Sequence, residues 1–130
     1  MASYRTPLSR ARGLGAAKHG VGTWIGERVG GVALVPLCLW AVFAAMRLAA
    51  HDYAFAVEWV SQPVNATLLV LLFAVSFWHM HDGMRIIVED YIHKTLSKAG
   101  LLLLNLLVCG LAGALSVISI LKVAFSGGVY

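Results

Sequence analysis

The residues whose types and spacing suggest chemistry lie close together in one apolar stretch, residues 64–88. His79, His81, Asp82 and Arg85 all occur in its second half. If this stretch crosses a bilayer, an ionisable group at that depth costs roughly 2 to 3 kcal/mol even on lenient scales. Such a cost implies that these side chains have partners or a task. Asp82 and Arg85 are three residues apart on one face of the helix and can neutralise each other, so we interpret this pair as structural.

His79 shares one face of the expected helix with Ser76 and Gly83. Positions three and four apart in a helix lie one above the other. An imidazole nitrogen can bind the iron of a flat macrocycle, and a glycine one turn away lets the porphyrin edge approach the backbone. The spacing suits a haem ligand at His79, with Ser76 lining the same pocket. The alternative is that His79 hydrogen-bonds a neighbouring helix and Gly83 serves close packing.

A second haem ligand has to come from elsewhere. His81 points about 200° away from His79 around the helix, so the two cannot bind one iron together. The other apolar stretches of the chain, described below, contain no histidine. A bis-histidine haem therefore requires a ligand from another chain, and a partner subunit is predicted.

Another group of polar residues lies where the apolar stretch ends. Tyr91 follows Asp90, and a phenol beside a carboxylate at the membrane surface can donate a hydrogen bond to a ligand carbonyl. The alternative is an interfacial tyrosine beside a solvated aspartate. We expect Arg28 at a similar depth, where it can pair with Asp90, a lipid phosphate or a haem propionate.

Three apolar stretches position these residues. The chain has 130 residues, 60% hydrophobic and 12% charged, whereas soluble proteins contain about a quarter charged residues. About 20 apolar residues cross a bilayer, and we expect helices at about 28–48, 64–90 and 99–124, with a short loop at 49–63. No room remains for a soluble catalytic domain. The prediction is an all-α membrane protein with three transmembrane helices.

The distribution of Lys and Arg predicts how these helices are oriented. Cations near span ends accumulate on the cytoplasmic or matrix side of a membrane. With the N-terminus on that inner side, the outer ends hold only Arg47 and Lys122. The inner ends hold Arg5, Arg10, Arg12, Lys18, Arg28, Lys94 and Lys98. The positive charge is thus a topology signal rather than a sign of nucleic-acid binding.

The expected organisation follows from these two arguments. A basic tail occupies residues 1–25 on the inner side, a three-helix anchor residues 26–125, and the outer C-terminal end residues 126–130. Cys38 and Cys109 both lie in apolar runs, so we expect no disulfide. Asn105, Cys109 and Gly113 recur at helical spacing in the third stretch, a small-residue seam that predicts helix packing.

The pattern of His79, Gly83, Asp90 and Tyr91, together with Arg28, resembles the hydrophobic membrane-anchor subunit of succinate dehydrogenase, respiratory complex II. The similarity is to alphaproteobacterial members in particular and covers most of the chain. It extends to residues 5–15, 24, 27–28 and 33–37.

This resemblance implies a function for each residue. Three helices pair with those of a second anchor of the cytochrome b type, and each anchor contributes one axial histidine to a shared haem b. His79 is then the iron ligand here, with Ser76 and Gly83 beside it and Arg28 near the propionates. Tyr91, with Asp90, hydrogen-bonds the head group of ubiquinone.

The resemblance also implies the partners and the place of the complex. Succinate oxidation takes place in a flavoprotein partner, which carries FAD, and the iron-sulfur clusters lie in a separate iron-sulfur partner. The chain is thus one component of an enzyme and not an enzyme by itself. We expect it in the bacterial cytoplasmic membrane, or in the inner mitochondrial membrane if the source is eukaryotic. The resemblance also leaves open assembly of the complex as a trimer of heterotetramers.

Three alternatives remain at this point. The anchor of a fumarate reductase shares the same architecture and works in the opposite direction. A small ion-coupled transporter would use His81, Asp82 and Arg85 as a relay. A scaffold protein would need none of these side chains.

Overall fold

The computed structural model describes residues 4, 6–13 and 20–126, and all regular structure in these ranges is α-helical. Arg5 and Lys18 of the expected tail, and residues 127–130 of the expected C-terminal end, lie outside the described residues. The helices are α1 (Pro7–Ala11), α2 (Val21–Ala49), α3 (Tyr53–Ser61), α4 (Pro63–Tyr91) and α5 (Thr95–Ser126). The predicted all-α class is confirmed.

The three long helices account for the three expected spans. α2, α4 and α5 are each long and apolar enough to cross a membrane, as predicted. All three extend beyond the stretches that predict them: α2, for example, begins at Val21 and takes in the last part of the expected tail. Hydropathy marks only the apolar section of a helix, whereas the backbone hydrogen bonds continue through the polar interface. The tail also contains the short helix α1, capped where Ser9 N donates to Thr6 Oγ1 (3.2 Å).

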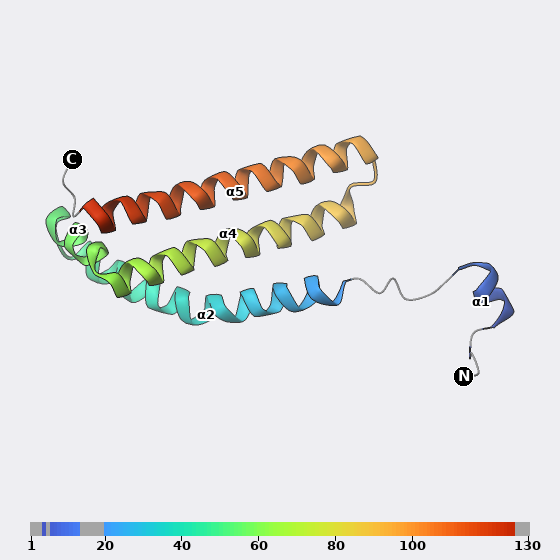
Figure 1. Cartoon of the computed structure of the whole chain (residues 1–130), viewed down its shortest axis with the longest axis horizontal. Helices are drawn as coiled ribbons and strands as arrows, with labels where there is room; N and C mark the ends of the chain where they lie inside the picture. Colours follow the sequence, from blue (N-terminus) through green and yellow to red (C-terminus); the bar gives the residue numbers. More distant parts are fainter. Residues whose placement is uncertain (1–3, 5, 14–19, 127–130) are drawn as a thin grey trace.

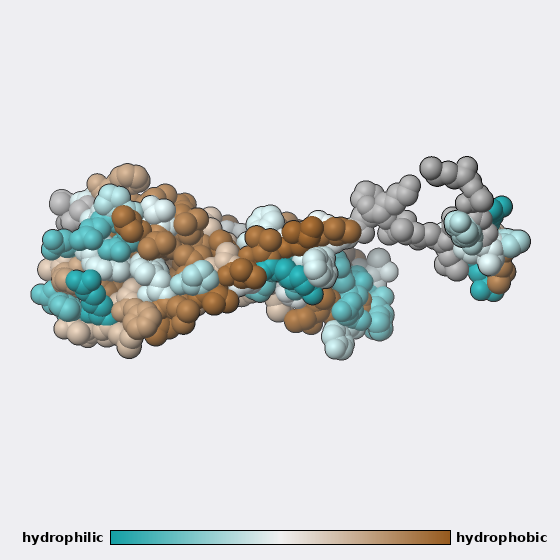
Figure 2. All heavy atoms as spheres, turned by 90° about the horizontal axis from the view of Figure 1, so that it is seen from below, coloured by the Kyte–Doolittle hydropathy of each residue, from teal (hydrophilic) through white to brown (hydrophobic). Residues whose placement is uncertain are grey.

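The long helices form an open layer rather than a closed bundle. α4 lies between α2 and α5 and makes the main contacts with both (Figure 1). In the described part of the chain the buried apolar residues are few: Ala44, Trp59, Ala66, Val88 and Cys109. Figure 2 shows hydrophobic side chains along the length of the helices, with hydrophilic ones gathered mainly toward the ends. Both faces of the layer are therefore available to lipid or to other helices.

α3 occupies the segment between α2 and α4, where we expected a loop. Asp52 caps it, accepting a hydrogen bond from Phe55 N at 3.0 Å, and a side-chain oxygen at this position satisfies a free amide of the first turn. The ring of Trp59 stacks on Trp40 of α2 with centroids 5.7 Å apart. Ser61 Oγ donates to the carbonyl of Val123 in α5 (3.3 Å). α3 thus closes one end of the layer.

The predicted packing seam of α5 lies against α4. A Cβ added at Gly113 would meet Cβ of Phe77 at 3.3 Å, a tight contact, so the glycine favours the close approach of the two helices. Asn105 Nδ2 donates to the carbonyl of His81 (2.9 Å). Cys109 is buried and Cys38 exposed, and both are free thiols, which agrees with the expectation of no disulfide.

Candidate functional site

The imidazole of His79 lies against α2. A Cβ added at Gly30 would be 3.4 Å from His79 Nδ1, and one added at Gly31 would be 3.5 Å from Cε1. The Nδ1–Cε1 edge of the ring therefore packs on a stretch of α2 that carries no side chains. Nδ1 is buried and has no hydrogen-bond partner among the described residues. The alternative that His79 hydrogen-bonds a neighbouring helix through this nitrogen is not supported.

Ser76 and Gly83, expected on the same face, lie in different surroundings. Ser76 lines a groove of about 540 Å³ between α2 and α4, together with Cys38, Phe73 and Met80. A Cβ added at Gly83 would meet no described atom within 4 Å. Gly83 therefore does not serve close packing within the described chain, and space remains beside it.

These observations test whether the residues suit a haem. A haem ligand needs an imidazole that is not engaged elsewhere and room for the edge of a macrocycle. The unpartnered ring of His79 and the open space at Gly83 meet both requirements. The described residues contain no cluster of three or more His, Cys, Asp or Glu side chains that could hold a metal ion by themselves.

The remaining charged residues of α4 pair differently from the prediction. We expected Asp82 to neutralise Arg85, but Arg85 Nε donates to Glu89 Oε1 at 2.8 Å. Asp82 instead lies 3.2 Å from Nδ1 of His81. The longer glutamate side chain spans the i,i+4 distance to Arg85, and the short aspartate side chain reaches only the adjacent ring. The expected Asp82–Arg85 pair is therefore wrong.

Arg28 is held by its own helix. Its guanidinium lies 4.0 Å from the centroid of the Trp24 ring, an arrangement stabilised by cation–π attraction. It also lies 3.8 Å from Glu27 and keeps 54% of its side chain exposed. Its ion-pair partner in the described chain is thus Glu27 and not Asp90. The exposed guanidinium still has donors for a phosphate or a carboxylate.

Asp90 and Tyr91 lie at the last turn of α4, away from His79. Twelve residues separate Tyr91 from His79, about 18 Å along a helix. Tyr91 is 77% exposed, and its hydroxyl makes no hydrogen bond that the described structure contains. Lys98 Nζ donates to the carbonyl of Glu89 (2.8 Å) and ties this turn to the start of α5. The structure therefore places the two candidate sites at different levels of one helix.

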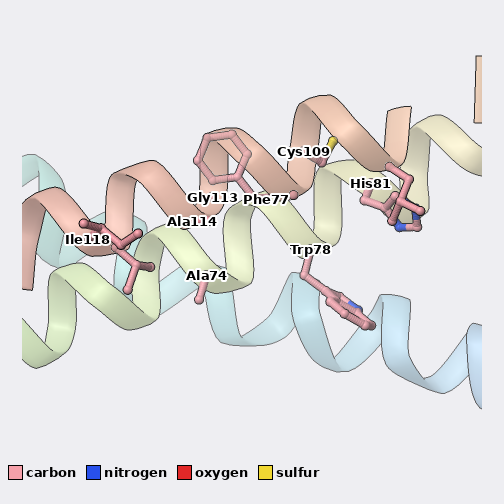
Figure 3. A pocket seen from close by; sticks show the side chains of 11 residues that line it. Ala74, Phe77, Trp78, His81, Cys109, Gly113, Ala114 and Ile118 are labelled. Carbon is pink, nitrogen blue, oxygen red and sulfur yellow. The ribbon is translucent and has the colours of Figure 1, made fainter. Parts of the chain in front are cut away.

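Two features escaped the sequence prediction. One is the groove of about 540 Å³ between α4 and α5, lined by Phe77, Trp78, His81 and Gly113 among others (Figure 3). The other is the contact of Gly30 and Gly31 with His79. The adjacent glycines in an apolar run were a visible signal, but nothing in the sequence shows which residue of another helix they face.

Three membrane-length helices with ionisable groups on the central one define a multi-pass, all-α membrane protein. Residues 2–119 match the model of one family, described as "Succinate dehydrogenase/Fumarate reductase transmembrane subunit". The chain belongs to this family.

Curated relatives agree with this assignment. The chain is 26% identical over 107 residues to the succinate dehydrogenase hydrophobic membrane anchor subunit of Rickettsia conorii. The aligned residues make up 82% of this chain and 85% of that protein. It is 24% identical over 125 residues to the protein of the same description from Rickettsia prowazekii, and this alignment covers 96% of this chain and 97% of that protein. The predicted resemblance to an alphaproteobacterial succinate dehydrogenase anchor is confirmed.

Proposed function

We propose that the chain is the haem-binding membrane anchor of a succinate:quinone oxidoreductase, with His79 as one axial ligand of a haem b. The observation that supports this role most directly is the His79 ring, unpartnered at its buried Nδ1 and packed on Gly30 and Gly31. With that edge against α2, Nε2 is the nitrogen left for the iron. A second anchor, of the cytochrome b type, supplies the other histidine, since α2 and α5 contain none.

The residues around His79 have supporting parts in this proposal. Gly83 leaves space for the macrocycle, and Ser76 lies one turn away on the side facing α2. Arg28, held over Trp24, presents its guanidinium to a haem propionate. When bound, a six-coordinate haem supplies a site that takes up and releases single electrons.

Tyr91 and Asp90 form the proposed ubiquinone site. The exposed hydroxyl of Tyr91 donates a hydrogen bond to a quinone carbonyl. This bond strengthens as the oxygen gains negative charge, so it favours the reduced quinone over the oxidised one. The Asp90 carboxylate can hold a cation from a partner protein near the same carbonyl.

The proposed orientation places this end of α4 next to the soluble partners. The excess of Lys and Arg at one side of the spans supports an inner N-terminus, which puts Arg28, Tyr91 and Lys98 on the cytoplasmic side of a bacterial inner membrane. The anchor then docks the iron-sulfur protein, and with it the flavoprotein, at the end of α4 where electrons from succinate reach the membrane.

The test is an absorption spectrum, dithionite-reduced minus oxidised, of the complex purified through this chain from its own membranes. We expect a six-coordinate b-type spectrum that is lost or perturbed by His79→Ala. His81→Ala is the matched control, because His81 lies on the same helix, pairs with Asp82 and should leave the spectrum unchanged. The assignment is contradicted if the parent complex contains no haem, or if the His79→Ala complex has the same spectrum as the parent.

A fumarate reductase anchor is the second candidate, since the matching family includes both enzymes. The two differ in the direction of turnover rather than in the architecture of the anchor. Comparing succinate-driven quinone reduction with quinol-driven fumarate reduction in the purified complex decides between them.

A further inference from the structure

Two adjacent glycines of α2 form the contact surface for His79. The ring is at ordinary van der Waals distance from a Cβ built at either position, 3.4 Å to Nδ1 from Gly30 and 3.5 Å to Cε1 from Gly31. At Gly22 and Gly26, earlier in α2, such an atom would meet nothing within 4 Å. The contact is therefore specific to Gly30 and Gly31 and is not a general property of the glycines in this helix.

A side chain at each of the two positions would meet a different atom of the ring. Gly30 faces a nitrogen that can donate or accept a hydrogen bond, whereas Gly31 faces a carbon. A hydroxyl on a side chain at residue 30 would come within hydrogen-bonding reach of Nδ1. Glycine carries no such group, and Nδ1 stays without a partner among the described residues.

The missing partner has a consequence for a metal-bound imidazole. In most metal sites the second ring nitrogen donates to a carboxylate, carbonyl or water, which fixes the ring and makes the ligand more basic. A more basic ligand donates more charge to iron and favours the oxidised ion, so hydrogen bonding to the ligand lowers the reduction potential. An imidazole whose Nδ1 is unpartnered has the opposite effect.

We propose that Gly30 and Gly31 are positioning residues for His79: because they carry no side chain they leave room for the Nδ1–Cε1 edge of its ring beside α2, and Gly30 keeps Nδ1 free of a hydrogen bond, which raises the reduction potential of the haem. This inference rests on the proposed function, because it requires His79 to bind the iron. Its basis is the pair of ring contacts and the buried nitrogen, which do not depend on the resemblance to any family.

The experiment is a redox titration of the haem in the intact purified complex, with haem content measured on the same samples. We expect Gly30→Ser to keep the haem and to lower its midpoint potential, because the hydroxyl accepts the Nδ1 hydrogen. Gly30→Ala adds the same carbon without the hydroxyl and should leave the potential at the parent value. Gly26→Ser, one turn earlier in open space, is the matched control and should also leave it unchanged.

The results separate this inference from a purely structural role for the glycines. If Gly30→Ser and Gly30→Ala change the potential equally, or neither changes it while haem content is normal, the inference is wrong and the glycines only allow close packing. If the parent complex contains no haem, or His79→Ala retains its spectrum, the proposed function fails and this inference fails with it.

A second measurement needs no variant at Gly30 and covers the case in which Gly30→Ser does not assemble. Pulsed electron paramagnetic resonance of the oxidised parent complex detects the remote 14N nucleus of each axial ligand, whose quadrupole coupling depends on whether that nitrogen is hydrogen-bonded. We expect one ligand, the one removed by His79→Ala, to show a remote nitrogen without a hydrogen bond. Two hydrogen-bonded remote nitrogens would overturn the inference.

Discussion

Polar side chains of α4 differ in whether this chain itself satisfies them. Arg85 is paired with Glu89, and Asp82 lies against the ring of His81, so these side chains find their partners within the helix. The Nδ1 atom of His79 has no such partner in the described structure. Because an unsatisfied polar group is costly in a membrane, His79 is the stronger candidate for a functional role, and the paired residues are the weaker ones for a transport relay.

At Tyr91 we predict a selective loss of quinone chemistry. Tyr91→Phe removes the hydroxyl and keeps the ring, so quinone reduction by succinate should fall roughly tenfold, equivalent to about 1.4 kcal/mol. Succinate oxidation with a soluble dye should persist, since that reaction does not use this residue. Equal loss of both activities would show instead that Tyr91 supports assembly of the complex.

The interface between α4 and α5 contains a close contact at a glycine. Phe77 occupies the space that a side chain at Gly113 would need, as the 3.3 Å separation shows (Figure 3). Asn105 adds a hydrogen bond between the same two helices. This interface depends on small residues at defined positions, whereas the surrounding leucines are exposed and need only be apolar.

We predict that Gly113→Leu lowers the stability of the folded chain by about 1 to 3 kcal/mol, because the added side chain overpacks the contact with Phe77. Gly110→Leu is the control: it removes a glycine from the same helix, where a Cβ meets nothing within 4 Å. Thermal unfolding of the detergent-solubilised complex measures both. If the two variants unfold alike, the proximity of Phe77 has no energetic effect.

A further prediction concerns α3. Asp52→Ala removes the acceptor for Phe55 N and should cost about 1 kcal/mol, the usual effect of losing such a cap. Asp52→Asn keeps an acceptor at this position and should retain most of that stability. Protection of the α3 amides in hydrogen exchange reports the difference, and identical protection in both variants would contradict it.

The sequence predicted correctly those features that depend on long continuous stretches of residues. Three runs of about 20 apolar residues predicted three helices, because length and hydropathy are sufficient for that inference. α3 was missed because it has nine residues and lies between polar ends. The predicted ion-pair partner of Arg85 was wrong because Asp82 and Glu89 both lie within reach of Arg85 along the helix. Gly30 lies beside His79 because of how α2 packs on α4, and a local sequence pattern does not predict that packing.

The three long helices form one layer, with α4 between α2 and α5 (Figure 1). Few side chains are buried in the described chain, so most of the apolar surface has to contact lipid or other proteins. The proposed partner anchor would cover part of this surface and would supply the protein on the other side of the proposed haem.

The predicted orientation can be tested on intact cells. In a background with Cys38 and Cys109 replaced by alanine, we expect a cysteine at Gln62 to react with a membrane-impermeant maleimide added outside. One at Lys94 should react only after the cells are opened. Both positions are exposed, Gln62 just before α4 and Lys94 in the connection that follows it, and the reverse pattern would place the N-terminus outside.

The central place of α4 also determines how freely each helix can change over evolution. A residue on α2 or α5 faces a neighbour on one side, and elsewhere any apolar side chain satisfies a lipid tail equally well. α4 has neighbours on two sides and also carries His79, His81, Asp82, Arg85 and Glu89. Random replacement along the chain should therefore be accepted often in the outer helices and seldom in α4, and homologous anchors should drift fastest where only lipid is in contact.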